Sequence, residues 1–372
     1  MKYYLVAGEA SGDLHGAMLI KELLLIDSTA RFRCWGGNSM MNAGAELVKD
    51  YKNFSIMGFW EVLKNIFTIT RLLKKCKKDI RAWSPDALIL IDFPGFNLRL
   101  ARFASECKIP VFYYISPKIW AWKESRINSI KKYVGHMFSI LPFEPAFYLK
   151  HNYAVEYIGN PLVDSVDVYL KKSVSHFTLL DELQLNDKKI IALLPGSRKQ
   201  EIEKILPVMA TMAKYFTGYH FIIAGISSLP VSLYRKHSCG LHLPLLFDRT
   251  YELLSCSHAA IVTSGTAVLE TALLNVPQVA LYKTSRLSYL IARALIKTKY
   301  ITLVNLILNK PAINEIIQNK MSETLRRELE KLLQNDNYRH QIINDYQRLR
   351  QLLGPAGAVR RAAQSIHAKM ND

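Results

Sequence analysis

Short apolar runs alternate with longer segments of helical periodicity along the whole chain. In the first half these runs span residues 3–7, 32–35, 87–91, 111–115, 136–141 and 155–158. In the second half they span 190–194, 220–224, 241–243, 259–262 and 278–281. Strands that alternate with helices are typical of βαβ units and parallel sheets. The pattern therefore predicts an α/β protein with two Rossmann-like domains and mainly parallel sheets.

The predicted domain boundary lies between the two sets of strands. Residues 159–162 read Gly-Asn-Pro-Leu and a polar tract covers 171–189. The chain of 372 residues also exceeds the roughly 250–300 at which a single core usually stops growing. We expect domains at 1–165 and 166–345. A helical segment at 346–372, broken at Gly354 and Pro355, should pack back on the first domain.

The first strand leads directly into a glycine-rich turn, residues 8–16, with the sequence Gly-Glu-Ala-Ser-Gly-Asp-Leu-His-Gly. Such a loop before a helix can hold a nucleotide or phosphate, which makes Ser11, Gly12 and Asp13 candidate binding residues. The spacing matches neither the dinucleotide fingerprint nor the Walker pattern. A tight strand-to-helix turn without a ligand is the alternative.

Two loops in the second half also combine small residues with helix starts. Gly196, Ser197 and Arg198 follow residues 190–194 and offer N–H groups and a guanidinium to a diphosphate. A second loop follows residues 259–262 and contains Ser264, Gly265 and Thr266. Glu270, about one turn later, is placed to accept ribose hydroxyls. Together the loops suggest a nucleoside diphosphate site, although both can be ordinary helix caps.

Asp92 follows the strand at 87–91 and lies among aromatic residues. Burial there would raise the pKa of its carboxyl and make it a candidate general base, while a turn or N-cap Asp is the alternative. Ser116, Trp120 and Trp122 follow the next strand and are candidates for a sugar or acyl cleft. Core packing of at least one of the two tryptophans is the competing interpretation.

A basic amphipathic segment covers residues 54–83. Apolar residues recur there at helical spacing, namely Phe59, Val62, Leu63, Ile66 and Phe67, and Arg71, Lys74 and Lys75 lie among the basic ones. Such a helix can lie in a membrane interface with its cations on lipid phosphates. Alternatively, it covers the sheet as an ordinary amphipathic helix.

The composition limits the setting and the partners. The net charge of +18 suits an anionic partner, which can be nucleic acid, a membrane surface or a phosphorylated substrate. Five cysteines without a C-x-x-C pair indicate a reducing compartment. His237, Cys239 and His242 are too few for a zinc site, so no metal is expected. With no secretory signal and no apolar run long enough to span a membrane, a cytoplasmic location is expected.

Eight motifs, read in order, resemble those of the lipid-A-disaccharide synthases. They start at Gly8, Met57, Asp92, Ser116, Leu141, Leu194, Ser264 and Val304, and read GEASGD, MGFWEV, DFPGFN, SPKIWAW, LPFE, LPGSR, SGTAVLE and VNL. The similarity runs from Lys2 to about Pro311. The helices beyond carry no diagnostic residues.

The resemblance implies a GT-B glycosyltransferase with its active site in the cleft between two domains. The donor would be UDP-2,3-diacylglucosamine and the acceptor 2,3-diacylglucosamine 1-phosphate, giving a β(1→6) disaccharide 1-phosphate and UDP. Asp92 would be the general base of an inverting reaction, and Asn305 would join the donor site. Since the donor loops lie in the second half, the loop at 8–16 would face them from the acceptor side.

The resemblance also implies a setting. The enzyme would lie on the cytoplasmic face of a Gram-negative inner membrane, use acylated glucosamine phospholipids, and bind no nucleic acid. The chain has no D-x-D sequence, so no metal or other cofactor is expected, and self-association is left open. Two alternatives are a UDP-sugar 2-epimerase of similar fold and a non-catalytic basic protein that binds membranes or nucleic acid.

Overall fold

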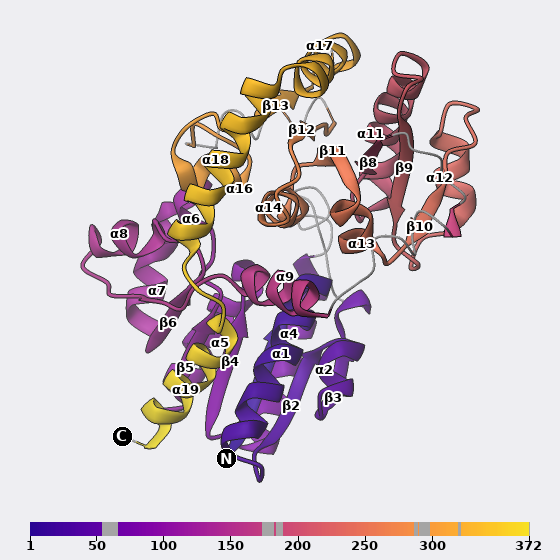
Figure 1. Ribbon diagram of the computed structural model, residues 1–372. Helices are drawn as coiled ribbons and strands as arrows, with labels where there is room; N and C mark the ends of the chain where they lie inside the picture. The colour runs from indigo at the N-terminus through magenta and orange to yellow at the C-terminus, as the bar shows by residue number, and fades with distance from the viewer. Residues whose placement is uncertain are drawn as a thin grey trace. The chain divides into compact units, whose positions relative to one another are not determined.

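Two units, each with a parallel sheet, make up the chain in a computed structural model (Figure 1). The structure describes residues 1–53, 66–172, 182–183, 189–285, 289, 298–318 and 321–371. Unit 1 comprises Met1–Asp164 and Pro355–Asp372, and unit 2 comprises Ser165–Gly354.

The sheet of unit 1 has the strand order β3-β2-β1-β4-β5-β6-β7, with every pair parallel. Its strands are β1 (Lys2–Ala7), β2 (Arg31–Gly36), β3 (Ala45–Asp50), β4 (Ala87–Ile91), β5 (Val111–Tyr114), β6 (His136–Ser139) and β7 (Glu156–Tyr157). The helices that begin in this unit are α1 (Ala10–Ile26), α2 (Asn38–Asn42), α4 (Ile66–Trp83), α5 (Pro94–Glu106), α6 (Ile119–Trp122), α7 (Ile127–Tyr133), α8 (Glu144–Leu149), α9 (Pro161–Lys171) and α19 (Ala358–Asn371).

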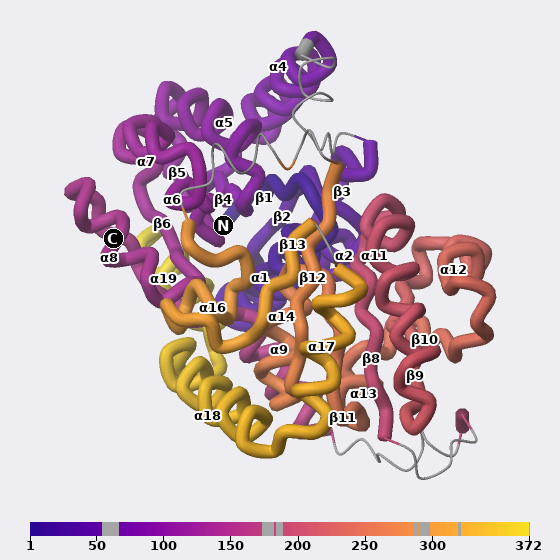
Figure 2. The backbone as a smooth tube through the Cα atoms, turned by 90° about the horizontal axis from the view of Figure 1, so that it is seen from above, coloured from indigo at the N-terminus to yellow at the C-terminus, as the bar shows by residue number. Residues whose placement is uncertain are grey.

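Helices cover both faces of this sheet, which explains why its central strands are apolar throughout. Leu5 of β1 belongs to the core that α1 and α19 complete. Val6, pointing to the opposite face, belongs to the core that α4, α5 and α7 complete. Figure 2 shows these three helices together on one side of the strands.

The closing helix α19 returns to unit 1, as the sequence predicts. The Asp164 carboxylate accepts hydrogen bonds from the N–H groups of Gly357 (2.5 Å), Ala358 (3.2 Å) and Val359 (3.1 Å) at its start. Apolar residues of α19 then pack with the core around α1. The predicted start at residue 346 is wrong, because α18 (Asp336–Leu353) continues until Gly354 and belongs to unit 2.

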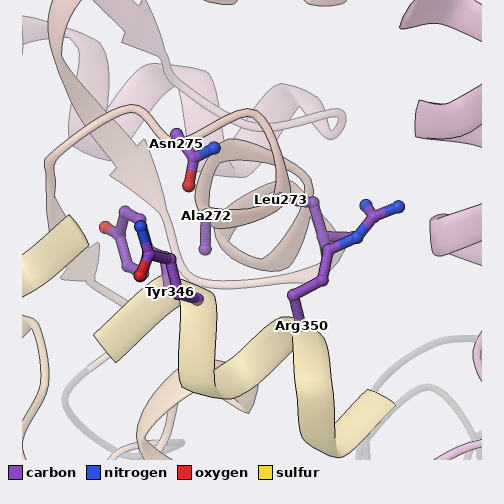
Figure 3. A pocket seen from close by; sticks show the side chains of 6 residues that line it. Ala272, Leu273, Asn275, Tyr346 and Arg350 are labelled. Carbon is purple, nitrogen blue, oxygen red and sulfur yellow. The ribbon is translucent and has the colours of Figure 1, made fainter. Parts of the chain in front are cut away.

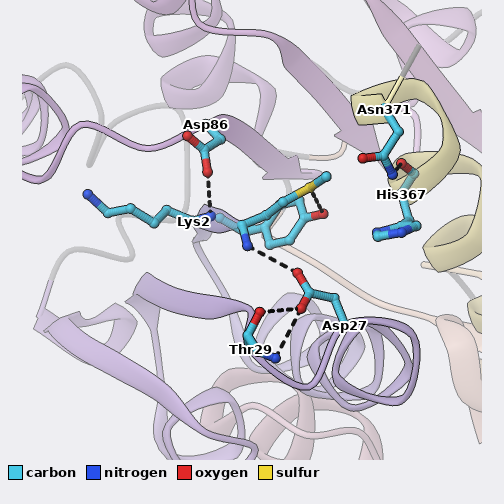
Figure 4. Close-up of polar contacts among 8 residues, drawn as sticks. Lys2, Asp27, Thr29, Asp86, His367 and Asn371 are labelled. Carbon is cyan, nitrogen blue, oxygen red and sulfur yellow. Dashed lines mark hydrogen bonds and ion pairs between the residues drawn. The ribbon is translucent and has the colours of Figure 1, made fainter.

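Polar contacts fix the amino-terminal end of β1 (Figure 4). The amino group of Met1 donates to Asp27 Oδ2 at 3.0 Å, and the N–H of Lys2 donates to Asp86 Oδ2 at 2.7 Å. Thr29 holds the Asp27 carboxylate through its N–H and hydroxyl. These bonds occupy the amino-terminal ends of β1 and β4. The carboxyl-terminal ends of the strands are therefore the ones available to a ligand.

The sheet of unit 2 has the order β10-β9-β8-β11-β12-β13 and is also parallel. Its strands are β8 (Ile190–Leu194), β9 (His220–Gly225), β10 (Leu245–Phe247), β11 (Ser257–Thr263), β12 (Gln278–Tyr282) and β13 (Asn314–Ile317). Its helices include α11 (Lys199–Thr211), α12 (Val231–His237), α13 (Thr250–Ser255), α14 (Thr266–Leu273), α16 (Leu303–Leu308), α17 (Met321–Gln334) and α18. Helix α11 contacts α12 and α17, and α14 contacts α16 and α18.

Three edge strands differ from the prediction. Strands β3 and β13 were not predicted, because their sequences, AELVKD and NEII, carry polar residues that are depleted in strands. The strand predicted at 241–243 is wrong. It lies instead at Leu245–Phe247, after Pro244, whose carbonyl accepts the N–H of Ile223 on β9. Proline is tolerated at the entry to an edge strand, and the apolar pattern alone did not show this.

Across the ranges that the structure describes, no helix combines the length and the apolar character needed to cross a bilayer.

Candidate active site

Both sheets reverse their strand order at one central pair, β1 with β4 in unit 1 and β8 with β11 in unit 2. Loops leave such a pair in opposite directions, and ligands of open α/β sheets bind in the crevice that this creates. In unit 1 the two loops begin at Gly8 and Asp92. In unit 2 they begin at Pro195 and Ser264.

The turn after β4 has an unusual backbone. Asp92 and Phe93 both take left-handed conformations, with φ of 43° and 45°. Left-handed backbone is costly for a bulky residue such as Phe, and strain of this kind persists only where the surroundings impose it. Gly8 leaves the space that the Phe93 side chain occupies, because a Cβ at this position would lie 2.4 Å from the Phe93 ring.

Two buried side chains hold the turn in place. The amide nitrogen of Asn97 donates to the carbonyls of Val6 (3.3 Å), Ile91 (3.2 Å) and Asp92 (2.9 Å). The hydroxyl of Tyr113 on β5 also donates to the Asp92 carbonyl, at 2.5 Å. Asn97 and Tyr113 are fully buried. The peptide of Asp92 is therefore fixed from two elements, which leaves its carboxyl in a defined position at the sheet edge.

The environment of Asp92 favours proton exchange near neutral pH. Burial raises the pKa of its carboxyl to about 6, against the opposing effect of the Lys118 charge. Glu9 raises this pKa further, and Arg126 lowers it. A carboxylate with a pKa close to the working pH is suited to act as a general base.

The loop after β5 contains the predicted residues Ser116, Trp120 and Trp122. Ser116 is buried, Trp120 is partly buried, and Trp122 is 45% exposed. The indole N–H of Trp120 donates to Glu144 Oε1 at 3.0 Å. Of the two tryptophans, Trp120 is thus anchored to the fold and Trp122 is the one that offers a ring face to solvent.

Glu144 is a site residue that the sequence analysis did not select, although it stands in the LPFE motif. It is almost fully buried and also accepts the N–H of Leu141 at 3.1 Å. Burial raises the pKa of its carboxyl to about 7. Its contacts show that it positions Trp120 from the loop after β6.

The glycine-rich loop after β1 is mostly structural. Asp13 is buried, and its carboxylate accepts the N–H groups of Gly37 (2.7 Å), Ser39 (3.0 Å) and Met40 (3.1 Å) at the start of α2. Gly12 lets α1 approach β1, since a Cβ there would lie 3.0 Å from that of Ala7. These contacts give Asp13 and Gly12 a structural role, and their contact with a ligand stays a prediction.

Ser11 is exposed at the start of α1, and its hydroxyl donates to Glu9 Oε1 at 2.7 Å. Of the three residues predicted in this loop, Ser11 alone has its side chain toward solvent.

In unit 2, the hydrogen-bond donors of the first predicted diphosphate-binding loop are already bound to a carboxylate of the protein itself. Glu201 Oε2 accepts the N–H groups of Ser197 (3.0 Å) and Arg198 (3.3 Å), and Glu201 Oε1 lies 3.3 Å from the Arg198 guanidinium. Gly196 makes this possible, because its φ is +108° and a Cβ would lie 2.4 Å from Glu201 Oε2. A diphosphate bound here would have to displace the Glu201 carboxylate, which the sequence pattern did not reveal.

The second loop of unit 2 is more open. Gly265 and Thr266 are exposed at the start of α14, and the first N–H groups of a helix have no acceptor within the helix. Glu270 lies one turn further on and accepts the hydroxyl of Tyr251 at 2.6 Å. Burial raises the pKa of Glu270. Ser264 is held by its N–H, which donates to the Leu281 carbonyl at 2.8 Å.

Asn305 has a structural role in this structure. It is buried, it exchanges two hydrogen bonds with the backbone of Ile313 (2.9 and 3.0 Å), and its amide donates to Glu315 Oε1 at 2.9 Å. Glu315 also holds the backbone N–H groups of Ile301 and Thr302. The amide of Asn305 is thus used within the fold, and its expected donor-binding role stays a prediction.

The basic helix α4 shows two different faces. Leu73, Cys76 and Ile80 are buried against the sheet, as the core interpretation requires. Phe67 is 88% exposed, and Arg71, Lys74 and Lys75 are exposed as well. Phe59, Val62 and Leu63, together with the side chain of Ile66, lie outside the described residues.

A small pocket of unit 2 lies away from these loops, between the end of α14 and α18 (Figure 3). Arg350 at its rim pairs with Asp167. It is lined by Ala272, Leu273, Asn275, Tyr346, Gln347 and Arg350. Because α14 begins at the carboxyl end of β11, its last residues lie toward the opposite edge of the sheet, and the pocket is separate from the candidate donor loops.

Comparison with known proteins covers almost the whole chain. The family model described as Lipid-A-disaccharide synthetase matches residues 3–369. A lipid-A-disaccharide synthase of Syntrophus aciditrophicus is 38% identical over 369 residues, covering 96% of this chain and 95% of the relative. One from Coxiella burnetii is 35% identical, covering 98% and 97%.

Among solved structures, the UDP-GlcNAc 2-epimerase of Neisseria meningitidis superposes with a TM-score of 0.70 at 16% identity, covering 99% of this chain and 100% of that one. The calicheamicin glycosyltransferase CalG4 gives a TM-score of 0.62 at 14% identity, covering 99% and 98%. At such identities these structures show the two-domain Rossmann-like fold of GT-B glycosyltransferases and related epimerases, and nothing about activity.

The structural role of Asp13 makes a prediction about stability. Asp13→Asn should lower the free energy of unfolding by about 2–3 kcal/mol, because three N–H groups, two of them in buried hydrogen bonds, lose a charged acceptor. Ser11→Ala, at an exposed position two residues away, should change it by less than about 0.5 kcal/mol. Urea unfolding of both variants measures the difference. Equal stabilities would contradict the structural role of Asp13.

Proposed function

The chain belongs to the lipid-A-disaccharide synthase family, and we propose that Asp92 is the general base of its reaction. Enzymes of this kind are UDP-sugar glycosyltransferases. The reaction moves 2,3-diacylglucosamine from UDP-2,3-diacylglucosamine to 2,3-diacylglucosamine 1-phosphate and releases UDP. The observation that carries the proposal is the fixed, half-buried carboxyl of Asp92 at the switch point of unit 1, with its pKa raised to about 6.

The chemistry needs a base on the acceptor side. As the 6-oxygen of the acceptor attacks the anomeric carbon of the donor, the bond from that carbon to UDP breaks and the hydroxyl proton must leave. Ionised Asp92 takes this proton, and its carboxyl later returns it to solvent. Attack from the face opposite UDP inverts the anomeric carbon and gives the β(1→6) linkage.

The departing UDP needs positive charge and N–H donors. We assign these to the start of α14, with Gly265 and Thr266, and to Ser197 and Arg198 at the start of α11. A diphosphate carries more negative charge than one carboxylate, so it can compete with Glu201 for the same donors. Glu270 would turn from the Tyr251 hydroxyl to the ribose.

We propose that these groups make a metal ion unnecessary. Helix N-termini and a guanidinium can stabilise a leaving diphosphate by themselves. In the described part of the chain, no group of three or more His, Cys, Asp and Glu side chains is placed to hold a metal ion. That observation does not decide the chemistry, and turnover in the presence of EDTA is the direct check.

We also propose that α4 brings the enzyme to its lipid substrates. The exposed Phe67 ring suits the interfacial region of a membrane, and Arg71, Lys74 and Lys75 suit anionic head groups. The buried residues of the same helix tie this surface to the sheet that carries Asp92. The net charge of +18 supports the same partner.

Replacement of the base tests the proposed function. Asp92→Asn should reduce turnover of the two acylated sugars to disaccharide and UDP by roughly 10²–10⁴-fold, the usual contribution of a general base. UDP affinity should not change. Asp86→Asn is the matched control, because Asp86 precedes the same strand at its other end and binds the backbone of Lys2. Near-normal turnover by Asp92→Asn would remove Asp92 from this role.

The exposed face of α4 makes a second prediction. The variant Phe67→Ser, Arg71→Gln, Lys74→Gln, Lys75→Gln should bind vesicles containing anionic phospholipid at least tenfold more weakly than the wild type, since about 1 kcal/mol is lost for each cation near the surface. A co-sedimentation assay measures this binding. Arg326→Gln, Arg327→Gln, Lys331→Gln removes the same number of charges from α17 and should retain binding. Equal loss in both variants would show that net charge, and not α4, is responsible.

A further inference from the structure

Arg126 is a half-buried cation that interacts electrostatically with Asp92 but forms no ion pair in the described part of the chain. It ends a short 3₁₀ helix, Glu124–Arg126, between the loop after β5 and α7. Among the described residues no carboxylate lies within ion-pair distance of its guanidinium. The adjacent Glu124 pairs instead with His151, at 3.0 Å. Burial lowers the pKa of Arg126 against the opposing effects of Tyr113 and Asp92, and a nearby like charge, Arg99, lowers it further.

Burying part of a cation without an ion-pair partner costs free energy. A bound anionic ligand would offset this cost. The Arg126 guanidinium instead lies 5.1 Å from the ring centroid of Trp122, and Lys123 Nζ lies 5.8 Å from the same centroid. Stacking on an aromatic ring orients a guanidinium and leaves its N–H edge for a ligand.

The charges around this arginine are mostly positive. Lys118 is exposed at the start of α6, one strand away from Asp92, and both Lys118 and Arg126 act on the Asp92 carboxyl. The acidic groups that face the same carboxyl or loop are Glu9, whose Oε1 accepts the Ser11 hydroxyl, and Glu144, which accepts the Trp120 indole. Both are occupied by hydrogen-bond donors from their own loops, and neither pairs with Arg126.

We propose that Arg126 and Lys118 bind the 1-phosphate of the acceptor sugar, with Trp122 against its ring or first acyl carbons. The inference rests on the proposed function, because it places that phosphate in unit 1 beside the base. A guanidinium donates two parallel hydrogen bonds to a phosphate, and an ammonium adds a point charge. With its phosphate held by this loop, the acceptor keeps its 6-hydroxyl, at the other end of the sugar, directed toward Asp92.

The diphosphate of the UDP-sugar donor is the other phosphate group that Arg126 and Lys118 can bind. The acceptor is favoured because Arg126, Lys118 and Trp122 stand on the loop beside Asp92, where the hydroxyl must lose its proton. The donor has its own N–H groups at the helix starts of unit 2. The experiment therefore needs one acceptor that carries the phosphate and one that lacks it.

The test compares 2,3-diacylglucosamine 1-phosphate with 2,3-diacylglucosamine as acceptors. The wild type should prefer the phosphorylated acceptor in kcat/KM. Arg126→Gln should lower kcat/KM for it by roughly 10- to 100-fold, the range for a charge-assisted hydrogen bond pair, and leave the other acceptor within about threefold. The KM for the UDP-sugar should stay unchanged. Arg126→Lys should recover part of the preference.

Arg102→Gln is the control, because Arg102 is exposed on α5 and pairs with Glu106, one turn along the same helix. An equal loss for both acceptors would make Arg126 a structural residue and overturn the inference. A raised KM for the UDP-sugar with the acceptor preference intact would assign Arg126 to the donor diphosphate and overturn it as well. If the wild type forms no disaccharide at all, the proposed function itself fails.

Discussion

The left-handed turn at Asp92 and Phe93 is the constraint on which the candidate site of unit 1 depends. A parallel sheet with helices on both faces provides the crevice, but only this turn sends a carboxyl into it from the end of β4. The turn is held by Asn97, which joins the ends of β1 and β4, and by Tyr113 on β5. Gly8 leaves room for the Phe93 ring. Three neighbouring strands thus determine the position of one catalytic group.

Electrostatics around this turn are balanced between burial and charge. Burial disfavours the ionised form of Asp92, whereas Lys118 and Arg126 favour it, so the carboxylate stays available as a base near neutral pH. The acceptor phosphate, once bound to these cations, would weaken their effect and make Asp92 more basic when the hydroxyl arrives. In unit 2 a carboxylate of the protein also occupies the ligand-binding groups. Glu201 accepts the N–H groups at the start of α11, and we propose that the more highly charged diphosphate replaces it there.

The apolar pattern was sufficient to predict the central strands and the loops that follow them, because those strands are buried on both faces and the apolar runs are closely followed by glycine, proline or polar residues. It did not predict the edge strands β3 and β13, which carry polar residues. Long-range partners were also beyond its reach. Asp13 bonds to N–H groups at Gly37 to Met40, Asn305 is held by Ile313 and Glu315, and nothing local in the sequence identifies these pairs. That Arg126 forms no ion pair with any described residue likewise becomes visible only in three dimensions.

The pH dependence of the initial rate, at substrate concentrations well below both KM values, shows whether Asp92 is the general base. Such a rate reports the groups of the free enzyme and of the free substrates, so it is measured with 2,3-diacylglucosamine, the acceptor without a phosphate that titrates near pH 6. Because the pKa of Asp92 is raised from 3.8 to about 6, the base is ionised above that pH and protonated below it. With Asp92 as the base, the rate should fall about tenfold per pH unit below about pH 6, in the wild type and in Glu144→Gln alike. A rate that stays constant down to about pH 4.5, or an acid limb that disappears in Glu144→Gln, would contradict this role.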